Sequence, residues 1–340
     1  APITMHTNLN SLTPTLKVVV LSRNRPEYLI KSLHSVLESA RLLPKSVTCN
    51  IEISDNSDSE NIVELVAKQY PQVAINLRRP NITVINHIKS VVREANTDYL
   101  VVFHDDDVMK PRFLSTLHAL LVSNPEAAAV GCNAYYMRNN VDTAASFMNQ
   151  NKATILVDTK DKLLNSYFLI GKRGTSPFPG YMYQVKYIDD TCLDETKGGI
   201  HADVSFLLDI VQRGSIVLTS EILMSYRLHE TNVNDSSTVA IQRGFLRYLN
   251  SQISIKKSQA LQDFRYTIML RWFREQHINI GSFTKWSHRQ KIVFKYIIYE
   301  LLKHLLRPDC RALHFQVMRD KYLGNLWARL KVLRKVLRGD

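Results

Sequence analysis

The chain has 340 residues, enough for one large α/β domain with an appendage or for two domains. Hydrophobic residues make up 45% and charged residues 22%, which excludes a collagen-like or disordered chain. Four widely spaced cysteines form no C-x-x-C pair, which argues against a zinc site or a disulfide framework and favours a reducing compartment. No segment approaches the ~18 continuous apolar residues of a spanning helix, and the leader at 1–14 shows no secretory signal.

The net charge of +13 is unevenly distributed. Residues 241–340 carry 21 Lys and Arg against 6 Asp and Glu, a net of +15. Residues 1–240 carry the remaining 23 and 25, a net of −2. This asymmetry indicates two units with different partners, at 15–240 and 241–340.

Short apolar runs alternate with helical patterns through residue 132. The patterns predict strands at 16–21, 49–54, 73–77, 99–103 and 129–132, and helices at 26–40, 60–69, 85–95 and 111–123. Repeated β-α-β units predict an α/β fold with a mostly parallel sheet flanked by helices. Polar clusters at 22–25, 55–58 and 104–107 each follow a strand, so they should meet at the carboxyl edge of the sheet, where ligands bind.

The second half of the chain is less regular. Glycines and prolines at 171–180 indicate loops with some strand over 133–200, a region we expect to face an acceptor. A helical stretch follows at 201–213 and a strand at 215–218, and from 241 onward the pattern is mainly helical.

Three consecutive carboxylates, Asp105, Asp106 and Asp107, directly follow the run at 99–103. Crowded like charges raise one another's pKa unless a cation or hydrogen bonds compensate. Carboxylate oxygens suit Mg²⁺ or Mn²⁺, and such a metal could hold a diphosphate. The alternative is a solvated loop that caps the helix at 111–123; the position after a central strand favours the metal site.

Two further groups carry chemistry. Asp203 precedes an apolar helical pattern, so it lies in the first turn of a helix, where the dipole favours a carboxylate whether or not it reacts. Arg227 and His229 are two residues apart after a strand and face the same way if the segment is extended. Both can donate to phosphate oxygens and His229 can ligate a metal, while the alternative is a polar loop.

Taken together, these segments resemble a known family. Residues 21–29 (LSRNRPEYL), 53–57 (ISDNS), 103–108 (FHDDDV), the Asp203 helix and 226–229 (YRLH) occur in the order seen in family 2 glycosyltransferases of the GT-A fold. The resemblance spans roughly 15–235 and implies a catalytic domain at 15–240, with a nucleotide-sugar half at 15–132 and an acceptor half at 133–240.

The resemblance implies roles for single residues. Asp203 would be the general base, and Asp105 and Asp107 would form the Asp-x-Asp, with Asp107 as the direct metal ligand. The donor is commonly a uridine diphosphate sugar. The resemblance implies that residues of four segments would bind it: Ser22, Asn24, Arg25, Asp55, Asp105, Asp106 and Arg227. His229 would join the metal, or with Arg227 steady the diphosphate. The sequence departs from the family in His104, where many relatives have an acid, and in Ala202, where many have Glu.

The implied reaction is inverting transfer of a sugar to a hydroxyl of a saccharide or lipid-linked saccharide in bacterial surface-polysaccharide synthesis, with Mn²⁺ or Mg²⁺ as cofactor. Two alternatives are a nucleotidyltransferase, which the lack of glycine in 21–28 disfavours, and an inactive nucleotide- or partner-binding protein. We expect a cytoplasmic protein, peripheral at the inner face of the plasma membrane. The sequence leaves a homo-oligomer open.

The basic tail carries its own prediction. Leucines and Trp327 recur at helical spacing over 323–337 with Lys and Arg between them, which is typical of an amphipathic helix on an anionic membrane. Packing of the apolar stripe on protein is the alternative. No nucleic-acid-binding motif accompanies the basic residues, so nucleic acid is not an expected partner.

Overall fold

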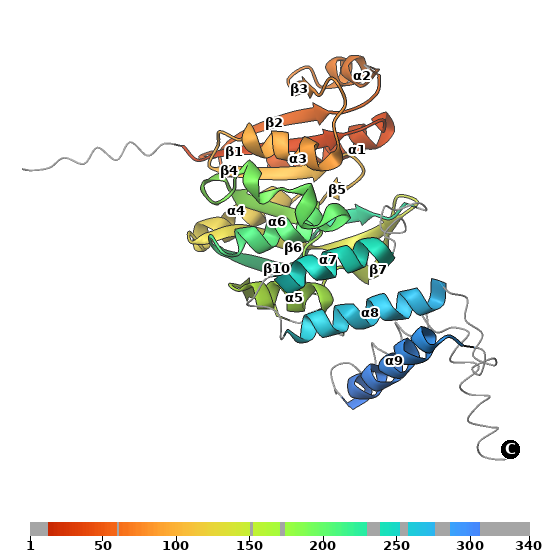
Figure 1. The fold of residues 1–340 in the computed structure, drawn as a ribbon. Helices are drawn as coiled ribbons and strands as arrows, with labels where there is room; N and C mark the ends of the chain where they lie inside the picture. The colour runs from red at the N-terminus through yellow and green to blue at the C-terminus, as the bar shows by residue number, and fades with distance from the viewer. Residues whose placement is uncertain are drawn as a thin grey trace, which may run out of the picture.

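The computed structural model describes residues 13–59, 61–149, 152–170, 174–229, 239–251, 258–275 and 286–306. Within them the chain forms a ten-stranded sheet with helices on both faces, followed by further helices (Figure 1). The predicted α/β class with a mostly parallel sheet and a helical C-terminal region is confirmed. The sheet order is β3-β2-β1-β4-β9-β6-β10-β5, with β7 on β6 and β8 on β10.

The first four strands are parallel neighbours: β1 (Thr15–Ser22), β2 (Thr48–Asp55), β3 (Ala74–Leu77) and β4 (Tyr99–His104). β1 pairs on one side with β2 and on the other with β4, so Val18 lies between Ile51 and Val101. Such a strand is buried on both faces, which explains its nearly continuous run of valines.

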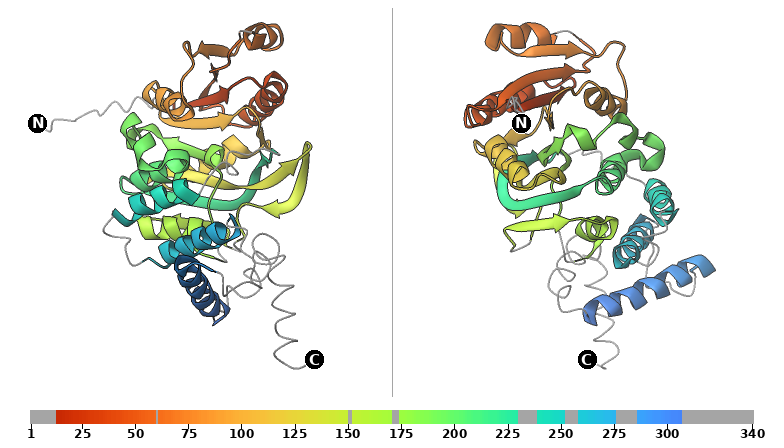
Figure 2. Two further views of the ribbon diagram at one scale, coloured as in Figure 1. Left: turned by 45° about the vertical axis from the view of Figure 1, so that its right-hand side comes forward. Right: turned by 90° about the vertical axis from the view of Figure 1, so that its left-hand side faces the viewer.

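Helices pack on both faces of these strands. Val18 and Val20 pack in one core with α1 (Pro26–Ala40), α2 (Asn61–Gln69) and α4 (Phe113–Ser123). Val19 and Leu21 point to the other core, which includes α3 (Val84–Arg93), α5 (Lys160–Phe168) and α6 (Ala202–Ile210). Figure 2 shows these helices on opposite sides of the strands.

The chain after residue 126 contributes two long strands, β6 and β10, and a short strand, β9, that lies between β4 and β6. β6 (Ala127–Arg138) and β10 (Ser215–Arg227) are parallel, and β9 (Tyr181–Gln184) lies antiparallel between β4 and β6. A hypothetical Cβ on Gly131 of β6 would come within 2.7 Å of the Tyr181 ring, so β9 packs against β6 without room for a side chain there. Shorter pairings complete the sheet: β5 (Val108–Met109), β7 (Val141–Ser146) and β8 (Thr154–Val157).

Two sequence-based expectations differ from the structure. The region 133–200, expected to be loops with some strand, also contains the helix α5, and its strand β9 lies in the middle of the sheet. β10 is longer than the expected strand at 215–218 and runs to Arg227, so Tyr226 and Arg227 end the strand rather than follow it. The parallel pairing with β6 supports these extra residues.

The C-terminal helices are α7 (Val239–Ser251), α8 (Gln259–Glu275) and α9 (His288–Leu306). α8 and α9 share a small core that includes Tyr266, Leu270, Val293 and Ile297. None of the described helices has the length and apolar character needed to span a bilayer. The expected amphipathic helix at 323–337 and residues 1–12 of the expected leader lie outside the described residues.

Candidate active site

The predicted polar clusters lie side by side at the carboxyl ends of β1, β2 and β4. The Asn56 amide donates to the Ser22 carbonyl at 2.9 Å, and the Asp105 amide donates to the Leu21 carbonyl at 3.0 Å. These bonds extend the parallel pairing of the strands into their loops. Residues that are more than 80 positions apart in sequence therefore share one surface.

Asp105 is buried and held by the loop after β1. Its Oδ2 accepts the Arg23 amide at 2.9 Å, and Oδ1 lies 3.4 Å from Arg25 Nη1. Burial raises the pKa of Asp105 to about 7, although these donors oppose the shift. The carboxyl group thus fixes the position of the β1 loop.

Asp106 lies between two basic side chains. Its Oδ2 is 2.6 Å from Arg25 Nη1 and 2.6 Å from His229 Nε2. Burial alone would raise the pKa of Asp106, but His104, His229 and Arg25 together hold it below its usual range. This carboxylate remains charged at neutral pH and links three segments of the chain.

Asp107 has one hydrogen-bonded oxygen and one without a hydrogen bond, and His104 Nδ1 lies 3.7 Å from the second. Oδ1 accepts the Arg227 amide at 2.8 Å, whereas Oδ2 is buried without a hydrogen bond from any described residue. Burial, followed by repulsion from Asp106 and Asp105, raises the pKa of Asp107 well above its usual value. A buried carboxylate oxygen without a donor requires an explanation, and a cation supplies one.

The geometry groups a metal-ligand set that overlaps the predicted one. Ligand atoms of His104, Asp106 and Asp107 all lie within 4.8 Å of one another. The set expected from the sequence is Asp105, Asp107 and His229, of which only Asp107 belongs to this group. Asp105 faces the backbone of the β1 loop, and His229 reaches the group through Asp106.

Arg227 is anchored on several sides. Its Nε donates to the Asp106 carbonyl at 2.7 Å, Nη1 donates to Asn140 Oδ1 at 2.9 Å, and its guanidinium lies 4.3 Å from the centre of the Tyr28 ring. Asn140 has a φ of 62° in the turn between β6 and β7. Such positive φ values favour Asn at a hairpin turn.

The expected nucleotide pocket is a hydrogen-bonded loop pair. Asp55 is fully buried; its Oδ1 accepts the Ser57 hydroxyl at 2.5 Å and its Oδ2 lies 3.1 Å from Arg79 Nη2. Asn24, at a φ of 57°, exchanges hydrogen bonds with Asp58. The Ser22 hydroxyl is buried and has no partner among the described residues, although its backbone carbonyl is bound.

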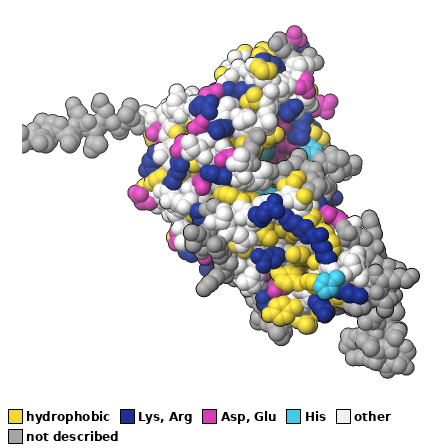
Figure 3. Space-filling view, in the orientation of Figure 1, with side chains coloured by type: hydrophobic (Ala, Val, Ile, Leu, Met, Phe, Trp, Pro, Cys, Tyr) yellow, Lys and Arg dark blue, Asp and Glu magenta, His cyan; other side chains and the backbone are white. Residues whose placement is uncertain are grey.

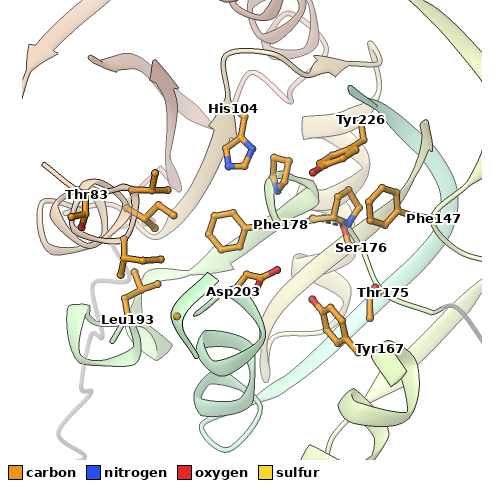
Figure 4. Close-up of a pocket in the computed structure, with 16 residues that line it drawn as sticks. Thr83, His104, Phe147, Tyr167, Thr175, Ser176, Phe178, Leu193, Asp203 and Tyr226 are labelled. Atoms are coloured by element: carbon orange, nitrogen blue, oxygen red, sulfur yellow. Dashed lines mark hydrogen bonds between the residues drawn. The ribbon is translucent and has the colours of Figure 1, made fainter. Parts of the chain in front are cut away.

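Asp203 begins α6 and lines a cavity of about 730 Å³ that His104 lines as well (Figure 4). Burial raises the pKa of Asp203 to about 6, against the backbone amides at the helix start. The same cavity is lined by Tyr226, whose pKa is raised first by burial and then by Asp107, Asp106 and Asp203. The acidic cluster and Asp203 are therefore both close enough to Tyr226 to raise its pKa.

Sequence reasoning missed several residues of this site. Arg79, which pairs with Asp55, and Tyr28, which supports Arg227, carry no local signal of their own. Asn140 had a usable signal, because Asn139-Asn140 is a turn pair before a strand. The sequence places His104 in the polar cluster at 104–107 and marks it as a departure from a family pattern, but does not predict it as a metal ligand.

Comparison with known proteins supports the fold. The sequence model described as "Glycosyltransferase like family 2" matches residues 14–162. No curated protein matches the chain at a significant level. Among solved structures, S. aureus TarS 1–349 in complex with UDP-GlcNAc is 13% identical, covers 85% of this chain and 81% of its own, and has a TM-score of 0.52. The mannosyltransferase PcManGT from Pyrobaculum calidifontis in complex with GDP-Man and Mn²⁺ is 12% identical, covers 88% and 83%, and has a TM-score of 0.52. The predicted GT-A fold agrees with these neighbours.

Proposed function

We propose that this chain, whose residues 14–162 form a glycosyltransferase family 2-like domain, is an inverting, metal-dependent glycosyltransferase. It would transfer a sugar from a nucleotide-diphosphate donor, a UDP-sugar in our proposal, to an acceptor hydroxyl. The observation that carries the proposal is the shared cavity of Asp203 and His104 (Figure 4). One wall holds a candidate base and the other begins the acidic cluster.

The residues of the cluster fit a divalent cation. Two carboxylates and one imidazole suit Mn²⁺ or Mg²⁺, and Asp107 Oδ2 accepts no hydrogen bond from the described residues, although His104 Nδ1 lies 3.7 Å from it. We propose His104, Asp106 and Asp107 as ligands. His229 would support Asp106 directly, and Asp105 would support it through Arg25, which contacts both carboxylates. When bound, the cation would neutralise charge on the departing diphosphate. The Mn²⁺ of PcManGT supports this choice.

Asp203 is suited to take a proton from the acceptor hydroxyl. A general base works best when its pKa lies near the operating pH, and burial brings the pKa of Asp203 to about 6. As Asp203 removes the proton, the acceptor oxygen attacks the anomeric carbon, and the bond to the diphosphate oxygen breaks on the opposite face. A single displacement of this kind inverts the anomeric configuration.

Arg25 and Arg227 would hold the diphosphate. The Arg25 side chain is 44% exposed, so it can turn from Asp106 toward a phosphate. Arg227 is 5% exposed and fixed by Tyr28 and Asn140, so it offers a pre-oriented positive charge. Ser22, Asn24 and Asp55 would shape the base and ribose pocket, with Asp55 acting through Ser57 and Arg79.

The alternatives predict different results. A nucleotidyltransferase would release pyrophosphate rather than a nucleoside diphosphate, and an inactive protein would bind a donor without turnover. The base of the donor is also open to test, because the neighbours bind UDP-GlcNAc and GDP-Man.

A thermal-shift screen tests the binding part of the proposal. UDP-GlcNAc, UDP-glucose and GDP-mannose are compared with and without MnCl₂. A donor at about 100 times its Kd should stabilise the fold by about 2.7 kcal/mol, and only with metal. The absence of any metal-dependent shift across the panel would refute the proposal. Release of nucleoside diphosphate, lost in Asp203→Asn but kept in Asp209→Asn, tests the chemistry.

The acceptor, in our proposal, is a saccharide or lipid-linked saccharide of polysaccharide synthesis on the cytoplasmic side of a membrane. The exposed face of α9 supports this: Ile292, Tyr299 and Leu302 are 53%, 60% and 56% exposed, with Lys295 between them. Figure 3 shows Lys and Arg beside hydrophobic side chains on the surface of the C-terminal helices. Basic and apolar groups on one face suit an anionic bilayer.

Vesicle sedimentation tests this surface. The protein should bind vesicles of phosphatidylglycerol more than those of phosphatidylcholine, and the double variant Tyr299→Glu, Leu302→Glu should bind less. Val122→Glu, on a remote exposed position of α4, serves as control. Equal binding to both vesicle types, or equal binding by the variant, would contradict a role for α9.

A further inference from the structure

The cavity beside Asp203 has walls of uneven chemistry. One side is formed by the first turns of α3, through Val84, Ile85 and Ile88, and Phe147 lies across from it, with Phe178 between them (Figure 4). In Figure 4 the Phe178 ring lies between His104 and Asp203. At about 730 Å³ the cavity falls in the size range that holds a drug-sized ligand.

Some polar groups of the lining are already used by the protein. Thr83 caps α3 by accepting the Asn86 amide at 3.3 Å, and the Ser176 hydroxyl donates to the Pro177 carbonyl at 3.2 Å. A sugar hydroxyl placed against Val84, Ile85 and Ile88 would lose its bound water there without a replacement, which is costly.

The charged side chains of the site lie in two separate regions, the cavity and the acidic loop. Among the described residues that line the cavity none is Lys or Arg, and Asp203 is the single acid. The guanidinium groups of Arg25 and Arg227 lie instead against the acidic loop. An anionic acceptor in the cavity would therefore meet the Asp203 carboxylate with no Lys or Arg beside it among the described lining residues.

We propose that this cavity takes an uncharged acceptor alcohol with an apolar body, such as a sugar with a hydrophobic aglycone or substituent. This inference rests on the proposed function, because it assigns the acceptor side of the same site. The reacting hydroxyl points to Asp203 while the apolar part packs against α3, Phe178 and Phe147. Val84, at the start of α3, is 61% exposed and forms an apolar rim to the cavity.

Ligand-observed NMR titration with three probes tests the proposal: methyl β-glucoside, hexyl β-glucoside and methyl β-glucoside 6-phosphate. Hexyl β-glucoside should bind about tenfold tighter than the methyl compound, which is less than full burial of the added methylenes would give. The phosphorylated probe should bind weakest. Equal binding of the methyl and hexyl probes, or preference for the phosphorylated one, would overturn the inference.

Variants at exposed valines distinguish binding in this cavity from non-specific hydrophobic binding elsewhere on the surface. Val84→Asp should reduce hexyl β-glucoside binding about tenfold, whereas Val122→Asp on α4, 59% exposed and outside the cavity, should leave it unchanged. Loss in both or in neither refutes the assignment. A nucleotide-dependent thermal shift is measured in parallel. A donor shift without hexyl preference rejects the inference alone, and hexyl preference without a donor shift rejects the proposed function alone.

Discussion

Replacement of Asp203 by Asn should stabilise the protein at neutral and higher pH while removing its activity. Burial raises the pKa of Asp203 from 3.8 to about 6, so the folded state holds its proton more tightly than the unfolded chain. A tenfold change in proton affinity between the two states corresponds to about 1.4 kcal/mol, which gives an upper value of about 3 kcal/mol for ionising this carboxyl in the fold. Because the side chain is partly exposed, we expect about 1–3 kcal/mol.

The sign follows from proton linkage. A carboxyl with a raised folded pKa contributes stability that is fully present below its unfolded pKa and is lost as pH rises through about 6. The variant cannot ionise, so it does not suffer this loss. Its advantage over the unmutated protein should be largest near pH 8 and shrink as pH falls toward 4.

Urea unfolding at several pH values measures the effect. Asp209→Asn is the matched control, because Asp209 lies on the same helix and contacts Lys197 at 3.4 Å. The control should be slightly destabilised near pH 8, because it loses the ion pair with Lys197. If Asp203 only favours the helix start, Asp203→Asn would instead lose about 0.3–1 kcal/mol near pH 8. That outcome would refute both the buried-base reasoning and the assigned role.

Three further outcomes are expected. Sugar transfer should rise with pH through about 6 as Asp203 loses its proton, and Asp203→Asn should lower kcat by roughly 10²–10⁴. Asp107→Asn should abolish the Mn²⁺-dependent thermal shift, whereas Asp142→Asn, which loses the ion pair with Lys110, should keep it; a shift retained in Asp107→Asn would contradict the metal site. Arg79→Ala should destabilise the fold by about 1–3 kcal/mol because it leaves Asp55 buried without its cation, while Arg112→Ala at an exposed pair should cost less than about 0.5 kcal/mol; similar losses in urea unfolding would count against the pairing.

Much of the fold of residues 15–132 could be predicted because its central strands are buried on both faces. β1 and β4 read as continuous apolar runs, and each predicted helix of the first half begins within two residues of the observed one. β9 could not be predicted in this way. It has only four residues, YMYQ, follows Gly180, and is selected by tertiary pairing with β4 and β6 rather than by any periodic pattern.

The site was predictable where chemistry follows a strand end and less so where it depends on packing. Asp55, the three acids and Asp203 lie where the strand and helix pattern puts them, and the structure brings the loops of β1, β2 and β4 together. The side chains that contact these acids could not be predicted from residue spacing in the sequence. Arg79 reaches Asp55 from a loop 24 residues away, and His104 joins the acids only because the chain turns after β4.

The placement of β9 has a consequence for how the protein can be divided. The backbone of β9 is hydrogen-bonded to β4 on one side and to β6 on the other. At Gly131 there is no room for a side chain between β6 and β9. A fragment ending near residue 132 would expose the edge of β4 and cut β6 in the middle. Residues 15–132 and 133–240 are thus expected to fold together and to fail as separately expressed pieces. Substitutions just before β9 should disturb the loops after β1, β2 and β4 and Asp203 alike.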